Sequence, residues 1–483
     1  MTRLPQPHPQ RTRRGHMVKK FALYSVVLAG SVALTGCLFK PDFERPVVLD
    51  EAPFTEATPT QDTLANLSWW DIFKDPHLQD LIRRSLAANR DLKIAMARID
   101  EARGLLGVAR PDQFPRLEVA GNATRVDGSD LAFIPTDATN DFGIYARLGF
   151  EVDVWGRYAS ATESQRAQLL STEYAMRAVT LGLVAQVATA YLQLQNVDRQ
   201  IDISERTLKN RHDATVLNEQ RFKGGYAGLL DVNQAQIQEE EARAALVAQK
   251  RAMRLIENAL CVLLGEVPHP IKRGASTIDP MSVRDLPVGV PAMLLERRPD
   301  VRSAEESARA AVMRIGVARA QQYPAFSITG FLGLNSIEHN TLFNSDARTW
   351  NIGAGLLGPL VDLGKSWSRV DAAEAQADQA LQSYEQSVLT AVREVEDALV
   401  SVRTFKEENK VRTAQVKAGR SASFLSRRRY VDGVTSYLEV LDTERSLFNA
   451  ELAQSSTQER YLGAIVQLYK ALGGGWQAEP VVR

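Results

Sequence analysis

The sequence repeats itself once, and this repeat limits the available folds more than any other feature. Markers of the first half return in the same order 208 or 209 residues later: residues 107–115 at 316–324, Asp153 at Asp362, residues 221–232 at 429–440 and residues 264–265 at 472–473. Small solenoid units repeat every 20 to 50 residues or so. The much longer period here indicates a duplicated element of domain size.

Each half is predicted to contain a helix, two strands, a very long helix and a further helix. The strand evidence is an alternation of apolar with polar or small residues, which gives a strand two different faces. It is seen at 142–154, 326–334 and 350–356, whereas 117–124 is the weakest strand. The pattern breaks near Gly358 and Pro359, where we expect a bulge or bend. A soluble, half-buried sheet would show the same alternation.

The long helices are predicted from two segments without proline, 155–221 and 364–429. At 1.5 Å per residue, each would span roughly 100 Å. Apolar residues recur within them at coiled-coil spacing, for example at Val388, Val395 and Val402. The shorter helices are expected to stack end to end beside the long ones. The turns at 223–225 and 432–433 would join helices, and the polar loops 126–140 and 337–347 would join strands.

The expected domain boundaries follow from this pattern. They are a signal peptide at 1–36, an extended segment at 37–67, a first repeat at 68–267 with its strand pair in 115–154, a linker at 268–290, a second repeat at 291–474 with its strand pair in 324–363, and a tail at 475–483.

The N-terminal residues resemble a bacterial lipoprotein signal. Residues 17–37 contain two lysines, a short apolar stretch and then Leu34-Thr35-Gly36-Cys37. We expect Cys37 to receive a diacylglycerol and an N-acyl chain, which together would anchor the protein stably. Leu38 after the cysteine favours the outer membrane by resemblance to sorting signals. Met17 is an alternative start, and an ordinary signal peptide or a twin-arginine signal is an alternative interpretation.

Composition argues against several classes of protein. The charges balance, with 58 Lys and Arg against 58 Asp and Glu, so no nucleic-acid partner is expected. Two cysteines and 6 histidines without HExxH spacing do not predict a metal site. No catalytic triad, phosphate loop or paired-carboxylate site stands out, so we expect neither an enzyme nor a cofactor other than the lipid on Cys37.

A membrane sheet would have to be shared between copies. Four strands cannot close a barrel, and open edges in lipid would leave backbone groups unpaired. The smallest barrels have about 8 strands, so two copies could supply 8 and three copies 12. The fold class expected is mainly α with membrane β: an oligomeric helical barrel continuous with a transmembrane β-barrel, with four strands per protomer.

The whole mature pattern resembles the TolC-like outer membrane efflux family, and more closely its NodT-type lipoproteins. The resemblance rests on residues 294–305 (LLERRPDVRSAE), on the stretch from there to Pro324, and on Trp69-Trp70 with 73–76. It implies a homotrimer with a 12-stranded barrel and a 12-helix periplasmic tunnel. It also implies a passive exit duct that works with a periplasmic adaptor and an inner-membrane pump, commonly of the resistance-nodulation-division class.

The same resemblance suggests where the periplasmic end would close. Glu439 and Asp442 lie three residues apart, hence on one helix face, and are matched in the first half by Asp231 and Gln234. Asp432 is a second acidic candidate, and Tyr430 matches a tyrosine that helps hold related channels shut. Thr435 stands where some relatives have a basic partner. Rings of carboxylates around an axis would attract cations; the alternative is that these are solvated surface acids.

Three charged residues of the strand region are candidates for the channel lining: Arg147, Glu151 and Asp153. Internal salt bridges would explain them equally well. We expect Arg297, Arg298 and Asp300 to start a helix and form structural ion pairs, and Cys261 to be a small core residue. The alternatives from other classes are a coiled-coil periplasmic adaptor or scaffolding lipoprotein and a lipid-anchored cell-wall hydrolase.

Overall fold

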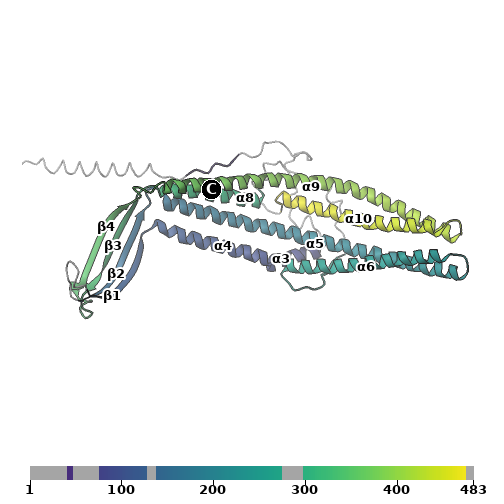
Figure 1. The fold of residues 1–483 in the computed structure, drawn as a ribbon, viewed down its shortest axis with the longest axis horizontal. Coiled ribbons are helices and arrows are strands. Elements are labelled where there is room, and N and C mark those ends of the chain that lie inside the picture. Colours follow the sequence, from purple (N-terminus) through teal and green to yellow (C-terminus); the bar gives the residue numbers. More distant parts are fainter. Residues whose placement is uncertain (1–40, 47–74, 128–137, 275–296, 475–483) are drawn as a thin grey trace, which may run out of the picture. The chain divides into compact units, whose positions relative to one another are not determined.

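The computed structural model describes residues 41–46, 75–127, 138–274 and 297–474 (Figure 1). Its elements, in chain order, are α3 Pro76–Ala88, α4 Arg90–Ala109, η2 Arg110–Gln113, β1 Arg116–Val126, β2 Thr139–Val152, α5 Arg157–Lys223, α6 Leu229–Leu264, α8 Pro299–Ala320, β3 Ala325–Ser336, η5 Ser345–Ala347, β4 Arg348–Leu357, α9 Lys365–Val431 and α10 Tyr437–Ala471. The predicted signal peptide, Cys37, most of the linker 268–290 and the tail 475–483 lie outside the described residues.

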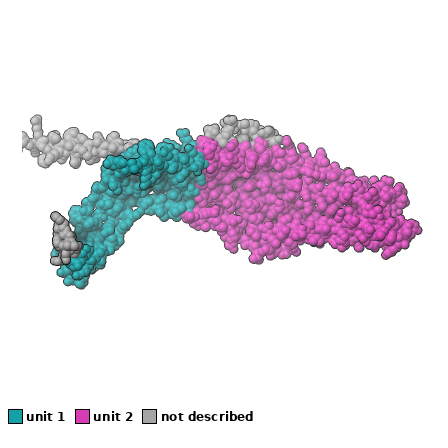
Figure 2. All heavy atoms as spheres, in the orientation of Figure 1, with its two compact units in different colours: residues 1–44, 102–169, 307–380 teal, residues 45–101, 170–306, 381–483 magenta. Residues whose placement is uncertain are grey.

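The chain divides into two compact units (Figure 2). Unit 1 contains residues 102–169 and 307–380, which include the strands, together with the chain up to Glu44. Unit 2 contains residues 45–101, 170–306 and 381–483, which include most of the helical residues. Both repeats contribute to both units, as expected for a duplicated element rather than two consecutive domains.

In unit 1 the strands form one antiparallel sheet in the order β1-β2-β3-β4. Its register places apolar residues opposite one another: Leu117 pairs with Leu148, Ile144 with Leu334, and Leu332 with Trp350. The other face carries mostly polar and small residues, with the rings of Tyr145 and Phe331 as exceptions. The two-faced alternation predicted from the sequence is therefore confirmed. β1 was expected to be the weakest strand, yet it extends over 11 residues.

The break predicted near Gly358 coincides with the end of β4 at Leu357. Gly358 packs directly against the start of β3, where an added Cβ would lie 2.6 Å from the Cα atom of Pro324. No side chain fits in that space, so glycine is required.

In unit 2, two helical hairpins are visible, α5 with α6 and α9 with α10 (Figure 1). α5 and α9 have 67 residues each, or roughly 100 Å. Each hairpin turn uses a glycine with positive φ, Gly225 and Gly433. Of the coiled-coil positions predicted in α9, Val388 and Val395 are buried and Val402 is partly buried. Val187 and Leu194, at the same spacing in α5, are also buried.

The prediction of one helix before the first strand pair was wrong in detail, because Asn89 separates α3 from α4. Asn89 has non-helical backbone angles, φ −54° and ψ 135°, and its Oδ1 accepts a hydrogen bond from the Leu92 N–H at 3.0 Å. A side chain that satisfies a free N–H at a helix start favours a new N-terminus at that point.

Among the described residues, α5 is the helix with an 18-residue window apolar enough for a membrane span by length and composition. The mean hydropathy of this window is 1.3, and 39% of it is buried inside the protein. Core helices of soluble proteins pass the same test, so one such helix is weak evidence. It is a mixed window rather than an unbroken apolar run.

Candidate functional site

The two hairpins of unit 2 are joined near their turns by Tyr430. Its side chain is buried, and its hydroxyl donates a hydrogen bond to Oδ1 of Asn218 in α5 at 2.6 Å. The guanidinium of Arg221 lies 4.5 Å from the centre of the Tyr430 ring and donates to the carbonyls of Tyr430 and Val431 at 3.3 and 3.1 Å. One tyrosine of the second hairpin is therefore held by two residues of the first.

The buried cluster around Tyr430 extends into both second helices. Ala235 of α6 and Tyr437 and Val440 of α10 complete it, and the rings of Tyr430 and Tyr437 lie 5.3 Å apart. Burial raises the pKa of Tyr437. Tyr437 therefore contributes as a neutral, packed side chain.

The predicted acidic candidates near the second turn are engaged differently. Glu439 forms an ion pair with Arg429 at 3.1 Å and accepts a hydrogen bond from Thr435. Asp442 pairs with Arg445, three residues along the same helix, at 3.1 Å. Asp432 is exposed in the turn. Partly or fully exposed pairs of this kind contribute only about 0–1 kcal/mol each.

Asp231 has a local role at the start of α6. Its Oδ2 accepts a hydrogen bond from the Gly228 N–H at 3.3 Å, and its own N–H donates to the Gly228 carbonyl at 3.1 Å. Its counterpart Glu439 also lies in the first turn of its helix. Both acids sit where the helix dipole favours negative charge.

The three predicted lining candidates of unit 1 separate into two groups. Arg147 lies on the polar face of the sheet, opposite Glu118 of β1 and Phe331 of β3, with its guanidinium 5.5 Å from the Tyr145 ring centre. Glu151 instead pairs with Arg157 at 2.9 Å and accepts from the Tyr158 hydroxyl at 3.0 Å. The internal salt bridge that the sequence left open as an alternative is thus present for Glu151.

Asp153 caps the first long helix. Its Oδ2 accepts a hydrogen bond from the Ala159 N–H at 2.8 Å. Its repeat counterpart Asp362 also accepts from an N–H at the start of a long helix, that of Ser366 in α9 at 2.9 Å, four residues along rather than six. The recurrence of this aspartate in the sequence is explained by helix capping in both repeats.

Arg298 ties three helices of unit 2 together. Its guanidinium donates to Asp300 at 2.6 and 3.0 Å, to Glu394 of α9 at 2.7 Å, and to the Ala471 carbonyl of α10 at 3.1 Å. Burial alone would lower the pKa of Arg298, but its hydrogen bonds with Asp300 raise it. Burial alone would raise the pKa of Asp300, but the same hydrogen bonds lower it. The structural ion pair predicted for Arg298 and Asp300 is present.

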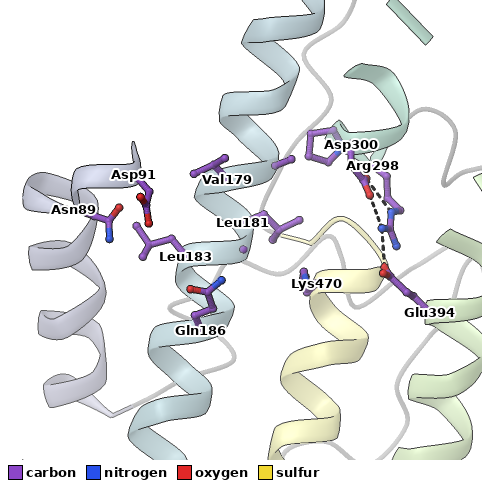
Figure 3. A pocket seen from close by; sticks show the side chains of 13 residues that line it. Asn89, Asp91, Val179, Leu181, Leu183, Gln186, Arg298, Asp300, Glu394 and Lys470 are labelled. Carbon is purple, nitrogen blue, oxygen red and sulfur yellow. Dashed lines mark hydrogen bonds and ion pairs between the residues drawn. The ribbon is translucent and has the colours of Figure 1, made fainter. Parts of the chain in front are cut away.

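A cavity of about 470 Å³ lies beside this cluster (Figure 3). Its walls include Leu181 and Leu183 of α5, Lys470 of α10 and Glu394 of α9. Figure 3 shows the Arg298 guanidinium bridging Asp300 and Glu394 at one side of the cavity, with Asn89 and Asp91 at the other. Within the described ranges, no group of three or more His, Cys, Asp and Glu side chains is arranged to hold a metal ion.

Sequence reasoning missed Asn218 and Arg221 at the hairpin contact. Arg221-Phe222 was recognised only as a repeat marker of Arg429-Tyr430. In the structure these equivalent arginines have different partners, because Arg221 binds the opposite hairpin and Arg429 binds Glu439. The recurrence indicated a turn-proximal position, whereas the partner depends on packing between hairpins.

Comparison with known proteins identifies relatives over nearly the whole chain. The profile of the family described as "Outer membrane efflux protein" matches residues 81–266 and 290–474. Outer membrane protein OprJ of Pseudomonas aeruginosa is 34% identical, over 94% of this chain and 96% of its own length. The toluene efflux pump outer membrane protein TtgC of Pseudomonas putida is 33% identical, over 92% of this chain and 93% of its own.

Solved structures give the same result for the fold. The structure of the outer-membrane channel OprN superposes with a TM-score of 0.84 at 31% identity. The match covers 90% of this chain and 99% of that one. The long hairpins and the four-stranded sheet are therefore features that this chain shares with a channel protein.

Proposed function

This chain belongs to the outer membrane efflux protein family, and we propose that three copies of it close a single duct that carries small toxic compounds out of the cell. Like its relatives, it is an outer membrane channel of an efflux system. The trimer, the route through it, its gate and its anchor are the parts that we propose.

The observation that carries the proposal is the open, two-faced sheet. β1 and β4 are its two edges, and each has one side without a strand partner within the described chain. In a membrane such edges must be paired, because lipid offers no hydrogen bonds to the backbone. Three copies supply 12 strands, which is enough to close a barrel with its apolar face toward lipid and its polar face toward the lumen.

We assign Arg147 to the lumen of this barrel, since it lies on the polar face opposite Glu118 and Phe331. Glu151 and Asp153 support the walls instead, through Arg157 and the start of α5. The charged lumen lining in this part of the duct is therefore smaller than the sequence alone suggested.

The helical hairpins would continue the duct and close it at their turns. The contact of Tyr430 with Asn218 and Arg221 holds the two hairpins of one copy together, which supports a closed resting state. Glu439, Asp442 and Asp432 of three copies would form acidic rings near the axis. Opening requires a partner that binds the open arrangement more tightly than the closed one.

The partners that fit this role are a periplasmic adaptor and an inner-membrane pump, the latter of the resistance-nodulation-division class. The chain then needs no chemistry of its own, because the pump supplies the energy. A relative is named for toluene efflux. We accordingly propose hydrophobic organic toxins as cargo, and lipidation of Cys37 as the anchor in the outer membrane.

The alternative of an adaptor or scaffolding lipoprotein would show one helical hairpin between soluble β-modules. The described residues instead contain two hairpins and a single open sheet. This arrangement favours the channel.

Planar-bilayer recording of the purified protein tests the proposal. We expect discrete conductance steps that favour cations, and a weaker cation preference in the variant Glu439→Gln/Asp442→Asn, because the rings lose their charge. Glu101→Gln, which removes an exposed acid of α4, is the matched control and should leave selectivity unchanged. Failure of the wild-type protein to give discrete steps would contradict the proposed function.

A further inference from the structure

The segment that follows β4 is strongly apolar, yet almost fully exposed. Leu360 and Leu363 are 97% and 98% exposed, and Leu357 and Val361 are also exposed. We call residues 357–363 the clasp segment. Exposed apolar groups concentrated in one place usually mark a contact surface.

The clasp segment is held in one conformation. The Asp362 carboxylate accepts hydrogen bonds from the N–H groups of Gly364 at 3.2 Å and Ser366 at 2.9 Å. Leu363 has a positive φ of 54°, which is uncommon for a residue with a side chain. A backbone fixed in this way presents its leucines outward without the entropic cost of ordering a loop on contact.

A second exposed apolar segment lies at the opposite edge of the sheet, just before and within the start of β1. It comprises Phe114, Leu117 and Val119. The second repeat contains an equivalent segment next to a central strand of the sheet. There Tyr323 and Phe326 correspond to Phe114 and Leu117, at an offset of 209 residues. Leu117 is 71% exposed, whereas Phe326 is 39% exposed.

Phe326 is less exposed than Leu117 because another residue covers the segment before β3. Trp155, which follows β2, stacks on the Tyr323 ring at 4.8 Å and lies 6.4 Å from the Phe326 ring. Its Nε1 donates to the Pro324 carbonyl at 2.8 Å. In the middle of the sheet, the segment after β2 therefore covers the segment before β3.

The clasp segment contains the repeat counterpart of that cover. Gly156 and Gly364, both with positive φ, are related by an offset of 208. By the same offset Trp155 corresponds to Leu363, the last residue of the clasp segment. The segment before β1 is the counterpart of the segment before β3. Within one copy it lies far from the clasp segment, because β1 and β4 are the two opposite edges of the sheet. With strands about 4.8 Å apart, the two edges are roughly 14 Å from each other.

We propose that the clasp segment of one copy packs on Phe114 and Leu117 of the next copy. The proposal rests on the proposed trimeric channel and deepens it. Strands alternate in direction through the sheet, so closing a ring places β4 antiparallel to the next copy's β1. The C-terminal end of β4 then lies beside the start of β1, which brings the two exposed apolar segments together.

The repeat also predicts the register of the new strand pair. The pairs Val119–Ala146 in β1–β2 and Ile328–Ala354 in β3–β4 are related by offsets of 209 and 208. Applying the same offsets to the internal pair Ala146–Leu332 places Ala354 of one copy opposite Ala123 of the next. This register keeps apolar residues on one face across the boundary between copies.

Site-directed cross-linking in the full-length protein tests the proposal, in a Cys261→Ser background that retains Cys37. Two differently tagged copies are co-expressed, one with Leu360→Cys and the other with Leu117→Cys, and treated with a short bismaleimide. A second pair, Ala354→Cys with Ala123→Cys, is oxidised to test the register. We expect both pairs to give a linked dimer that carries both tags.

The control pair is Ala354→Cys with Val119→Cys, which is off register by about 13 Å. It should not link, and neither should Leu360→Cys alone. Linking by Leu360→Cys alone would show a self-complementary contact and overturn the proposal. If the protein gives discrete bilayer conductance but Leu360→Cys and Leu117→Cys do not cross-link, the proposed clasp contact is wrong and the proposed channel is not affected. If neither cross-link forms and no discrete conductance is seen, both the clasp contact and the proposed channel function are contradicted.

A substitution series supplies a second measurement. Leu360→Asp/Leu363→Asp should lower the assembly constant by about a hundredfold or more, because two leucines can no longer be buried. Phe343→Asp, in the exposed loop between β3 and β4, is the matched control and should assemble normally. Normal assembly of the double variant would contradict the proposal.

Discussion

Asn89 and Arg298 occupy equivalent positions in the two repeats and make the same backbone contact. Asn89 Nδ2 donates to the Leu263 carbonyl at 2.9 Å, and Arg298 Nη1 donates to the Ala471 carbonyl at 3.1 Å. Each acceptor lies at the end of the second helix of a hairpin, and each donor at the start of another helix. The two side chains therefore join short helices end to end, and only Arg298 adds charge to the joint.

This difference predicts unequal costs of removing the two side chains. Arg298→Ala should lower the free energy of unfolding by about 2 kcal/mol. This is less than the loss expected when one partner of a fully buried ion pair is removed, because Asp300 and Glu394 remain partly in contact with water. Thermal or urea unfolding in detergent, followed by circular dichroism, measures the change.

Asn89→Ala is the companion variant and should cost about 1 kcal/mol, the usual value for a lost helix cap. Arg314→Ala, which removes an exposed arginine of α8, should change the stability little. Equal losses for Arg298→Ala and Arg314→Ala would show that the joint does not stabilise the helices.

The Arg298–Asp300 pair also predicts a pH dependence. The folded protein lowers the pKa of Asp300, so the pair's contribution is complete above the ordinary carboxyl pKa of about 3.9 and is lost as pH falls through the lowered value. The stability difference between wild type and Asp300→Asn should therefore shrink on acidification from about pH 5 downward.

Asp91→Asn provides the control, because Asp91 occupies the equivalent position where the neighbour is Asn89 rather than an arginine. Unfolding curves at several pH values compare the two variants with wild type. A difference for Asp300→Asn that stays constant down to pH 2 would contradict the proposed ion pair.

Tyr430→Phe tests the contact between hairpins. The variant keeps the ring under Arg221 but loses the hydrogen bond to Asn218. A net loss of about 1 kcal/mol per copy would raise the open-to-closed ratio roughly fivefold for each contact broken. Single-channel recording should show longer or larger openings.

Tyr226→Phe, in the turn of the other hairpin, removes an exposed tyrosine hydroxyl and should behave like wild type. If Tyr430→Phe and Arg221→Ala both leave the open probability unchanged, this contact does not hold the channel shut.

Cys37→Ser tests the proposed anchor. The variant should lack the diacylglycerol and N-acyl chains, and mass spectrometry of the mature protein should detect their loss. Circular dichroism should remain that of wild type, because Cys37 lies outside the folded elements described. An unchanged mass would mean that Cys37 is not the lipidated residue.

The sequence predicted the elements because their signals are local or repeated. The alternation at 142–154 and the absence of proline from 364–429 each act within one element, and the repeat confirms them independently. The break at Asn89 was missed because an asparagine within a helical pattern is not a stop signal unless its side chain finds a free N–H.

The site was less predictable because its partners come from distant segments. Tyr430 was identified, but Asn218 lies 212 residues away and nothing in the local pattern marks it. Glu151 and Asp153 were placed on the polar face by alternation, whereas the nearby start of α5 binds both. Periodicity gives the face of a residue but not which neighbour satisfies its charge.

The mass of the intact assembly tests the central claim most directly. Native mass spectrometry of the protein extracted gently from membranes should give three copies of the mature, lipidated chain as the dominant species. A stable monomer that remains soluble without detergent and never inserts into bilayers would contradict the account.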